Sequence, residues 1–261
     1  MDLHAILEAI ASAEREGAKL ILSASHIAAE NKTSPRDVVT AYDRAVQALL
    51  EERLSAAVPG ACFFCEESTE QGSLTAEHVF IIDPIDGTMN FVHGCHYSCI
   101  SVAYASFGTV KAGAVYDPYA DEMFTAVLGG GAFCNGKPIC ASSAPLSENL
   151  CSCGTAPYHS ELTDLTFSVM RRMLSFSLDL RRSGSAALDL CNVAAGRTGL
   201  YFEAILSLWD YAAGALICAE AGGRVSDMKG APLPLTGETS SVLAGGVKCY
   251  EDYFSSPSPE N

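Results

Sequence analysis

One stretch of the chain decides how the rest is interpreted: His78-Val-Phe-Ile-Ile-Asp83-Pro84-Ile85-Asp86-Gly87-Thr88-Met89-Asn90-Phe91. Its apolar residues predict a buried strand that ends on Asp83, because Pro84 has no N–H with which to continue a ladder. Gly87 allows a sharp turn that aims Asp83 and Asp86 at one point. With the Ile85 carbonyl they form an oxygen-only ligand set, which favours Mg²⁺, Mn²⁺ or Ca²⁺ over zinc. The alternative interpretation is a polar turn after a buried strand.

The residues after this turn indicate a place for a phosphate group. Thr88 opens a short helical segment whose free N–H groups can hold a phosphate oxygen. A second segment, Gly131-Ala-Phe-Cys-Asn-Gly136-Lys137, has phosphate-loop spacing, but Pro138 stands where Ser or Thr would bind magnesium, so we expect a hairpin turn there. A calcium loop of the EF-hand type is excluded, because its alternating acidic ligands and final glutamate are missing.

Two further acidic segments strengthen the metal interpretation. Cys65-Glu66-Glu67-Ser68 ends a predicted strand with adjacent carboxylates, an arrangement that is costly unless cations or water lie beside them. Leu208-Trp209-Asp210-Tyr211-Ala-Ala-Gly214 places an aspartate where an apolar segment meets the start of a helix. Asp210 is predicted either as the N-cap of that helix or as a metal ligand, since the two roles compete for the same oxygens.

The remaining pattern predicts a layered α/β or α+β fold. Apolar residues follow helical spacing over 3–30, interrupted near Gly17, and again in a second helix with Asp43 near its start. Residues 31–35 have the composition of a loop. A tightly spaced antiparallel meander is predicted over residues 61–65, 78–82, 98–105, 110–116 and 122–127.

The second part of the chain alternates helices and strands after Pro145. Its clearest helix runs from Asp210 to about Ala221 and stops at Gly222-Gly223. We expect one domain over 1–261, with soft halves 1–145 and 146–254 and a disordered tail over 255–261.

Composition limits the classes of partner. The 261 residues carry 16 Lys and Arg against 31 Asp and Glu, a formal net charge of −15, which argues against binding nucleic acid or an anionic membrane. No apolar stretch reaches about 18 residues and the N-terminus lacks the features of a signal peptide, so we expect no membrane span and a cytoplasmic location. The 11 cysteines are then expected as reduced thiols. A zinc site at Cys62 and Cys65 is the alternative to buried, inert thiols.

Together these segments resemble the signatures of the inositol monophosphatase family. The resemblance covers most of the chain, with order and spacing preserved, and rests on Asp83-Pro-Ile-Asp86-Gly87-Thr88 with Asn90-Phe91, Glu66-Glu67-Ser68, Trp209-Asp210 with Ala213-Gly214, Val39-Thr40-Ala41-Tyr42-Asp43, Gly131-Ala132-Phe133 with Asn135-Gly136, and Gly184-Ser185-Ala186-Ala187 followed by Glu203. It implies a layered α-β-α-β-α sandwich, magnesium-dependent hydrolysis of a small phosphate monoester, and usually a homodimer.

The resemblance also implies two to three Mg²⁺ ions. Glu66, Asp83 and the Ile85 carbonyl would hold the first ion. Asp83, Asp86 and Asp210 would hold the second, and a third, weaker ion would lie near Glu66. Such ions bridge phosphate oxygens, lower the pKa of bound water and neutralise charge on the leaving alkoxide. Because the acidic pocket alone repels phosphate, we expect metal binding to be required before substrate is held.

The catalytic base and the substrate contacts follow from the same resemblance. Asp43 and Thr88 would orient and deprotonate the attacking water, and Glu66 would also contribute to catalysis. Lys32 lies on a mobile loop that approaches the metal site when it closes. The residues expected around the substrate are Asp86, Gly87, Thr88, Gly184, Ser185, Ala186, Glu203 and Asp210.

The substrate is expected to be inositol 1-phosphate or a similar small sugar or polyol phosphate, because Glu203 can accept hydrogen bonds from ring hydroxyls. Fructose 1,6-bisphosphatase, histidinol-phosphate phosphatase and nucleotide 3′-phosphatase activities are the alternatives. A bisphosphate would need basic residues near its second phosphate, for which the second half offers the pairs Arg171, Arg172 and Arg181, Arg182. A non-catalytic alternative is a partner protein of the transcription machinery. Inhibition by Li⁺ is also implied by the resemblance.

Three positions depart from the family pattern. Cys65 stands where glycine is usual, Gln47 replaces a frequent glutamate, and His96-Tyr97-Ser98 replaces a more apolar stretch. None of them is a predicted metal ligand, so we expect activity. An exposed Cys65 would make the enzyme sensitive to oxidants.

Overall fold

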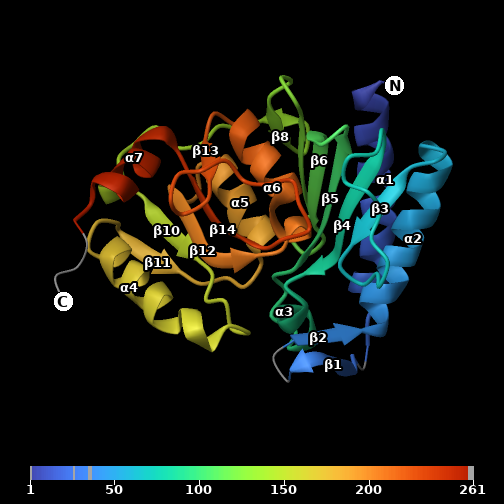
Figure 1. Cartoon of the computed structure of the whole chain (residues 1–261), viewed down its shortest axis with the longest axis horizontal. Coiled ribbons are helices and arrows are strands. Elements are labelled where there is room, and N and C mark those ends of the chain that lie inside the picture. Colours follow the sequence, from blue (N-terminus) through green and yellow to red (C-terminus); the bar gives the residue numbers. More distant parts are fainter. Residues whose placement is uncertain (1, 26, 35–36, 258–261) are drawn as a thin grey trace.

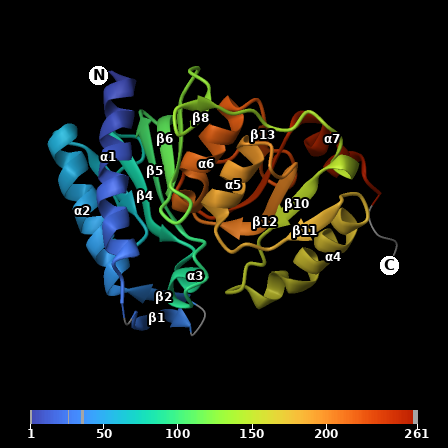
Figure 2. The same cartoon turned by 180° about the vertical axis from the view of Figure 1, so that it is seen from behind.

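Two β-sheets alternate with three layers of helices (Figure 1, Figure 2). The structure is a computed structural model that describes residues 2–25, 27–34 and 37–257. Helices α1 and α2 form one outer layer, α5 and α6 lie between the sheets, and α4 and α7 cover the other side. This is the predicted α-β-α-β-α sandwich.

The first sheet has seven strands in the order β3-β4-β5-β6-β7-β8-β9. Its strands are β3 (Cys62–Cys65), β4 (Val79–Asp86), β5 (Cys99–Ser106), β6 (Thr109–Asp117), β7 (Glu122–Val127), β8 (Ala132–Cys134) and β9 (Lys137–Pro138). The prediction of an antiparallel meander is wrong for β3, which pairs with β4 in parallel. Residues 66–78 carry the chain back along the sheet between these strands, and such a crossover produces a parallel pair. The predicted hairpin at Gly136 is formed by β8 and β9.

The first outer layer consists of α1 (Leu3–Leu22) and α2 (Ala41–Ala57). The first helix is shorter than predicted and continues through Gly17 without interruption. A Cβ added at Gly17 would lie 3.1 Å from Ile100 Cδ1 and 3.2 Å from Val46 Cγ1. The missing side chain therefore lets α1 approach both α2 and the sheet.

A two-stranded hairpin, β1 (Ala29–Ser34) and β2 (Asp37–Thr40), connects these helices. The loop predicted over residues 31–35 is therefore wrong for 31–34, and Pro35 lies outside the described residues. The buried Val38 and Val39 favour an extended β2. Antiparallel pairing with β2 then extends the polar segment that carries Lys32.

The second sheet has five strands in the order β11-β10-β12-β14-β13. Its strands are β10 (Leu150–Cys153), β11 (Asp179–Arg181), β12 (Leu200–Leu206), β13 (Arg224–Ser226) and β14 (Ser240–Gly245). The remaining helices are α3 (Thr88–Val92), α4 (Thr163–Leu174), α5 (Ala186–Ala194), α6 (Leu208–Glu220) and α7 (Val247–Ser255), with short 3₁₀ helices at Leu146–Glu148 and Ser160–Leu162. Buried residues of α5 and α6 belong to one apolar cluster with residues of both sheets, so the two sheets share a core.

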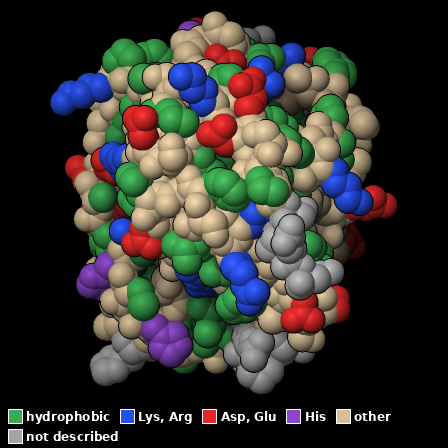
Figure 3. All heavy atoms as spheres, turned by 90° about the vertical axis from the view of Figure 1, so that its left-hand side faces the viewer, with side chains coloured by type: hydrophobic (Ala, Val, Ile, Leu, Met, Phe, Trp, Pro, Cys, Tyr) green, Lys and Arg blue, Asp and Glu red, His purple; other side chains and the backbone are tan. Residues whose placement is uncertain are grey.

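Helices α4 and α7 lie on the side of the molecule away from α1 and α2 (Figure 1), and Figure 3 shows this side with hydrophobic side chains scattered among charged ones. Both helices leave large apolar side chains exposed, including Phe167 on α4 and Phe254 on α7. None of the helices within the described ranges is long and apolar enough to cross a membrane. Of the tail predicted to be disordered, Ser255 is the last residue of α7, and residues 258–261 lie outside the described part.

Candidate active site

The end of β4, just before the turn at Gly87, carries two aspartates, Asp83 and Asp86, so the strand continues three residues beyond its predicted end at Asp83. The register between β4 and β5 shifts between Asp83 and Asp86, because Pro84 interrupts the ladder. Asp83 Oδ1 accepts a hydrogen bond of 3.0 Å from the Ile85 N–H, which fixes the carboxylate within the turn. Gly87 has φ 89°, and a Cβ there would lie 3.0 Å from the Tyr97 carbonyl oxygen and 3.1 Å from that of Gly184. Only glycine fits this position.

Four carboxylates from three parts of the chain form what we call the acidic wall: Glu66, Asp83, Asp86 and Asp210. Asp83 and Asp86 are buried, whereas Glu66 and Asp210 are half-buried at the border of a cavity. Burial raises the pKa of Asp83 well above its usual range, and the carboxylates of Glu66, Asp86 and Asp210 raise it further. The pKa of Asp210 is raised by burial and then by Asp86 and Glu66. The four carboxylates of the acidic wall therefore repel one another when ionised, and a cation bound among them would relieve this repulsion.

Asp210 is held by the first turn of α6. Its Oδ2 accepts a hydrogen bond of 2.7 Å from the Ser207 N–H, and Ser207, not Asp210, is the N-cap of the helix. The N-cap alternative for Asp210 is thus wrong: the side chain is the acidic partner in a capping box. This arrangement uses one carboxylate oxygen for the fold and leaves a second oxygen for a ligand at the cavity.

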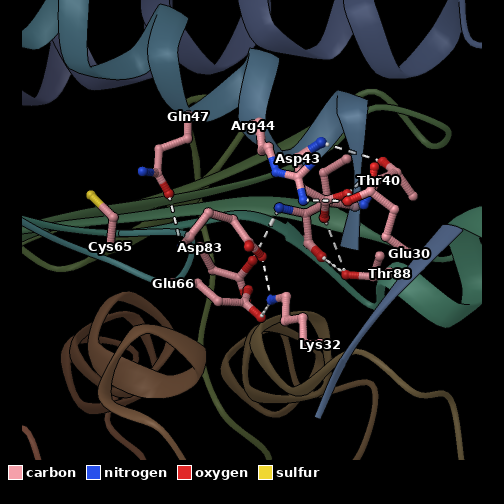
Figure 4. A network of polar contacts seen from close by, with 12 residues as sticks. Glu30, Lys32, Thr40, Asp43, Arg44, Gln47, Cys65, Glu66, Asp83 and Thr88 are labelled. Atoms are coloured by element: carbon pink, nitrogen blue, oxygen red, sulfur yellow. Dashed lines mark hydrogen bonds and ion pairs between the residues drawn. The ribbon is translucent and has the colours of Figure 1, made fainter. Parts of the chain in front are cut away.

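Asp43 and Thr88 lie on adjacent elements and form a hydrogen-bonded pair (Figure 4). Thr40 caps α2 and donates to Asp43 Oδ2 through its N–H (2.8 Å) and its hydroxyl (2.5 Å). The other oxygen, Asp43 Oδ1, lies 3.3 Å from Thr88 Oγ1, which is also 3.0 Å from the Ile85 carbonyl oxygen. Asp43 is fully buried, and burial raises its pKa, which makes it a stronger base than an exposed aspartate.

Lys32 extends from β1 towards the acidic wall (Figure 4). Its Nζ lies 2.8 Å from Glu66 Oε1 and also pairs with Glu67. Burial lowers the pKa of Lys32, but Glu66 and Glu67 raise it more, so the ammonium is charged at neutral pH. Glu30 on the same strand pairs with Arg44 of α2 at 2.7 Å, which ties the hairpin to the helix.

Two of the departures from the family pattern have a clear structural setting. The Gln47 side chain accepts a hydrogen bond of 3.1 Å from the Glu67 N–H and donates one of 3.0 Å to Ser68 Oγ, so a neutral amide fixes the acidic segment without adding charge. Cys65 is fully buried, and burial raises the pKa of its thiol. Its sulfur points away from the Lys32–Glu66 contact (Figure 4). Sensitivity to oxidants was expected only for an exposed Cys65, and the thiol is buried.

Asp86 connects the acidic wall to the middle layer of helices. Its Oδ2 accepts hydrogen bonds from Ser185 Oγ (2.6 Å) and from the Ala187 N–H (2.7 Å), both at the start of α5. Ser185 is the N-cap of α5, and Gly184 before it has φ 97°. The N-terminus of α5 thus stabilises the charge on Asp86.

The opposite side of the cavity, which we call the Glu203 wall, consists of Arg182, Asp189, Tyr201 and Glu203. Glu203 Oε2 accepts from the Tyr201 hydroxyl (2.7 Å) and Oε1 from the Ala156 N–H (3.1 Å). Asp189 accepts a hydrogen bond from Ser183 Oγ, and burial raises its pKa to about 8. Each carboxylate on this side therefore has a donor from the protein itself.

One cavity of about 420 Å³ gathers nearly all of the predicted site residues. Those that line it are Lys32, Glu66, Asp83, Ile85, Asp86, Gly87, Thr88, Gly184, Ser185, Ala186, Glu203 and Asp210. Asp43 lies behind Thr88 and does not line it. Sequence reasoning missed Gly154, Asp189 and Tyr201 as members of the cavity. Gly154 follows an apolar strand, and a Cβ there would lie 1.9 Å from the Glu203 carboxyl group, but only the fold reveals that contact.

The donor set fits a hard divalent cation by its chemistry. The acidic wall and the Ile85 carbonyl supply only oxygen ligands, which suit Mg²⁺. In the arrangement described, no three acidic, histidine or cysteine side chains of residues 2–25, 27–34 and 37–257 are close enough to hold a metal, and Glu66 is bound to Lys32 instead. A divalent cation therefore fits because the four carboxylates of the acidic wall repel one another and Lys32 supplies only one positive charge.

Comparison with known proteins agrees with this geometry. The model of the inositol monophosphatase family matches residues 2–255. "Inositol monophosphatase 2" of Solanum lycopersicum is 41% identical over 219 residues, covering 81% of this chain and 83% of that protein. "Putative Nus factor SuhB" of Neisseria meningitidis serogroup B is 38% identical over 226 residues, covering 85% and 86%. The solved inositol monophosphatase from Anabaena (Nostoc) sp. PCC 7120 has a TM-score of 0.87 at 30% identity and covers 99% of both chains.

Proposed function

The chain belongs to the inositol monophosphatase family and is a phosphoric monoester hydrolase, and from this we propose that it hydrolyses inositol 1-phosphate or a similar small sugar or polyol phosphate with the help of Mg²⁺. One observation carries the proposal. The Thr88 hydroxyl joins a buried carboxylate, Asp43, to the carbonyl of Ile85 beside the acidic wall, at 3.3 and 3.0 Å. The Thr88 hydroxyl thus lies between the base, Asp43, and the Ile85 carbonyl of the proposed cation site.

The metal would be held by the acidic wall. Glu66, Asp83 and the Ile85 carbonyl form the first ligand set, and Asp83, Asp86 and Asp210 form the second, with two to three ions in total. Bound Mg²⁺ supplies charge that neutralises the phosphate and its leaving alkoxide. Bound cations would also offset the charges of the neighbouring carboxylates, which add to burial in raising the pKa of Asp83.

The protein's own groups would activate the water. Thr88 Oγ1 takes a proton from the water while its own proton moves to Asp43 Oδ1, so the carboxylate is the final acceptor. The Thr40 hydrogen bonds keep Asp43 Oδ2 occupied and leave Oδ1 facing Thr88. The N–H groups of Gly87 and Thr88 would bind phosphate oxygens at the start of α3.

The Glu203 wall would bind the alcohol part of the substrate. Glu203 is fixed by Tyr201 and Ala156, so its carboxylate is preorganised to accept hydrogen bonds from ring hydroxyls. Gly184, Ser185 and Ala186 would border the same group, and Lys32 would close over the phosphate from its hairpin. We also propose a cytoplasmic homodimer that Li⁺ inhibits, as the resemblance implies.

Phosphate release tests this function. The substrates are inositol, fructose, histidinol and adenosine phosphates, each with Mg²⁺ and with EDTA. We expect Mg²⁺-dependent release that falls by about 1000-fold in Asp83→Asn. The matched control is Asp117→Asn, since Asp117 is also buried but anchors the N–H groups of Tyr119 and Ala120 outside the cavity. A folded wild-type protein that releases no phosphate from any compound would refute the proposal.

A second candidate function is binding to the transcription machinery, which the relative named as a Nus factor favours. Asp83→Asn separates the two functions. A partner protein keeps its affinity for purified RNA polymerase in this variant, whereas a phosphatase loses turnover. Co-sedimentation of the wild-type and variant proteins measures the first property, and absence of complex with either protein removes this candidate.

A further inference from the structure

Three basic side chains line the cavity in the described part of the chain: Lys32, His159 and Arg182. Two of them already have acidic partners. Lys32 pairs with Glu66 at 2.8 Å, and His159 Nδ1 lies 2.8 Å from Glu161. For Arg182, no described residue forms an ion pair with the guanidinium, whose Nε donates to Thr155 Oγ1 at 3.2 Å. Arg182 therefore borders the cavity with a guanidinium that forms no ion pair with a described residue, although its charge lowers the pKa values of Asp189 and Glu203.

The guanidinium lies beside the loop that connects the two walls. A Cβ on Gly184 would come within 2.6 Å of Arg182 Nη1, so glycine at this position makes room for the arginine. The Gly184 carbonyl oxygen in turn lies 3.1 Å from the position of a Cβ on Gly87, at the turn of the acidic wall. Arg182 thus borders the same space as the predicted phosphate site, but from the side of the Glu203 wall.

The acidic groups of the Glu203 wall do not neutralise Arg182 by contact. Glu203 is bonded to Tyr201 and Ala156, and Asp189 is bonded to Ser183. Burial raises the pKa of Asp189 to about 8 and also raises that of Glu203. Arg182 opposes both shifts through its charge, but neither carboxylate forms an ion pair with it, so the N–H donors of the guanidinium remain available.

The adjacent arginine provides a contrast within the same segment. Arg181 pairs with Asp179, donates to the Leu180 carbonyl at 2.7 Å and does not line the cavity. Both arginines are exposed at the end of β11. The two arginines therefore differ in their partners and not in their exposure, and only Arg182 forms no ion pair with a described residue and is in position to bind a ligand.

We propose that Arg182 determines specificity for substrates that carry a second anionic group, a phosphate or a carboxylate, on the alcohol part. The proposal rests on the proposed phosphatase function and names the substrate class within it. A guanidinium presents two parallel N–H donors that match the geometry of a phosphate or carboxylate group. Placed on the Glu203 wall, it binds the group that is not hydrolysed, while the acidic wall and its metal act on the other.

The test uses two substrate pairs that differ only by the second anion: fructose 1,6-bisphosphate against fructose 1-phosphate, and 2-phosphoglycerate against glycerol 2-phosphate. kcat/KM is measured with Mg²⁺ for the wild type, Arg182→Gln and the control Arg181→Gln. We expect Arg182→Gln to lose about tenfold or more on the doubly anionic member relative to its partner, since hydrogen bonds to charged groups have this magnitude. Arg181→Gln should leave the ratio unchanged. The pair with the larger effect identifies the preferred anion.

Equal losses on both members of each pair would overturn the proposal, because Arg182 would then act on the scissile phosphate or on folding. Calorimetric binding of the same compounds separates this result from failure of the proposed function. A wild type that hydrolyses none of them, but binds the doubly anionic members more tightly in an Arg182-dependent manner, contradicts the phosphatase function and supports the role of Arg182. Binding that Arg182→Gln leaves unchanged contradicts that role.

Discussion

The two walls of the cavity both contain buried carboxylates, but they differ in what surrounds each charge. On the acidic wall the pKa of Asp83 is raised by burial and then by Glu66, Asp86 and Asp210. On the Glu203 wall, Glu203 has two donors from the protein, the Tyr201 hydroxyl and the Ala156 N–H. The acidic wall also has donors from the protein, among them Lys32 at Glu66 and Ser185 at Asp86, but it gathers four carboxylates that repel one another, whereas the Glu203 wall holds two.

The difference predicts what each wall does for the reaction. The crowded carboxylates of the acidic wall would act on the reacting atoms once they hold a cation. A carboxylate that is already hydrogen-bonded offers its remaining lone pairs to a substrate hydroxyl, and this affects binding more than chemistry.

The largest expected effect is on the acidic wall. Asp210→Asn keeps an oxygen that accepts the Ser207 N–H, so α6 retains its capping box, but the ligand charge is lost. We expect kcat to fall by about 1000-fold at saturating substrate. Steady-state kinetics with Mg²⁺ titration checks this, and circular dichroism verifies the fold.

The matched change on the other wall is Glu203→Gln, which also replaces a carboxylate by an amide of the same shape. Here we expect KM to rise by about tenfold with kcat nearly unchanged. If Glu203→Gln instead lowered kcat as strongly as Asp210→Asn, the distinction between the walls would be wrong.

A smaller effect is expected where the walls are joined. Asn90 on α3 donates to the Tyr97 carbonyl (2.8 Å) and to the Ser183 carbonyl (2.9 Å), and it thereby holds the loop that brings Ser185 to Asp86. Asn90→Ala should lower kcat/KM by about 10- to 100-fold, because a misplaced ligand carboxylate is costly for catalysis. Half-saturation by Mg²⁺ should shift upward in the same variant.

The control for this variant is Asn192→Ala. Asn192 donates to the Tyr97 hydroxyl at 2.9 Å, so its removal also deletes a polar contact between distant segments but leaves the Asp86 contacts intact. Equal losses of kcat/KM in both variants, with the Mg²⁺ requirement unchanged, would mean that Asn90 only stabilises the fold.

The parts of the site that the sequence predicted are those in which a few consecutive residues determine the geometry. In the segment from Asp83 to Thr88, glycine makes the turn and α3 begins at Thr88, both by local chemistry, whereas the predicted end of the strand at Asp83 is wrong because β4 continues through Pro84 to Asp86. The start of the second helix near Asp43 was also predicted, whereas the capping box of Thr40 and Asp43 was not, although it depends only on neighbours along the helix. Such local rules, together with the family resemblance, account for most of the candidate site.

What the sequence did not predict depends on contacts between distant segments. The polar segment at Lys32 is extended because β2 pairs with it, and β3 runs parallel to β4 because of its crossover. Arg181 and Arg182 are identical residues, so nothing local distinguishes the arginine in the cavity from the one bound to Asp179. These features follow from tertiary structure, which no residue pattern within one segment encodes.

Glu14 is a buried carboxylate outside both walls, and it shows what burial costs without a role in the site. Glu14 lies on the inner face of α1 between Ile10 and Gly17, has no exposed surface, and neither of its carboxylate oxygens has a hydrogen-bond partner among the described residues. Burial raises its pKa well above the usual value, while Arg15 and the backbone of Val102 only partly oppose this. Unlike the acidic wall it does not line the cavity of the candidate active site. Its charge should therefore destabilise the fold without contributing to catalysis.

Glu14→Met tests this with the smallest expected effect. A group whose pKa is raised in the folded state stabilises most below its unfolded pKa, about 4.5, and that stability is lost as the pH rises towards the folded value. The variant should thus gain about 1 kcal/mol in free energy of unfolding at pH 7.5 and less at pH 4.5, with kcat unchanged. Urea unfolding at both pH values measures this. An equal gain in the free energy of unfolding at both pH values would mean that folding does not change the pKa of Glu14. A buried carboxylate would then be costly only where other carboxylates surround it, as on the acidic wall.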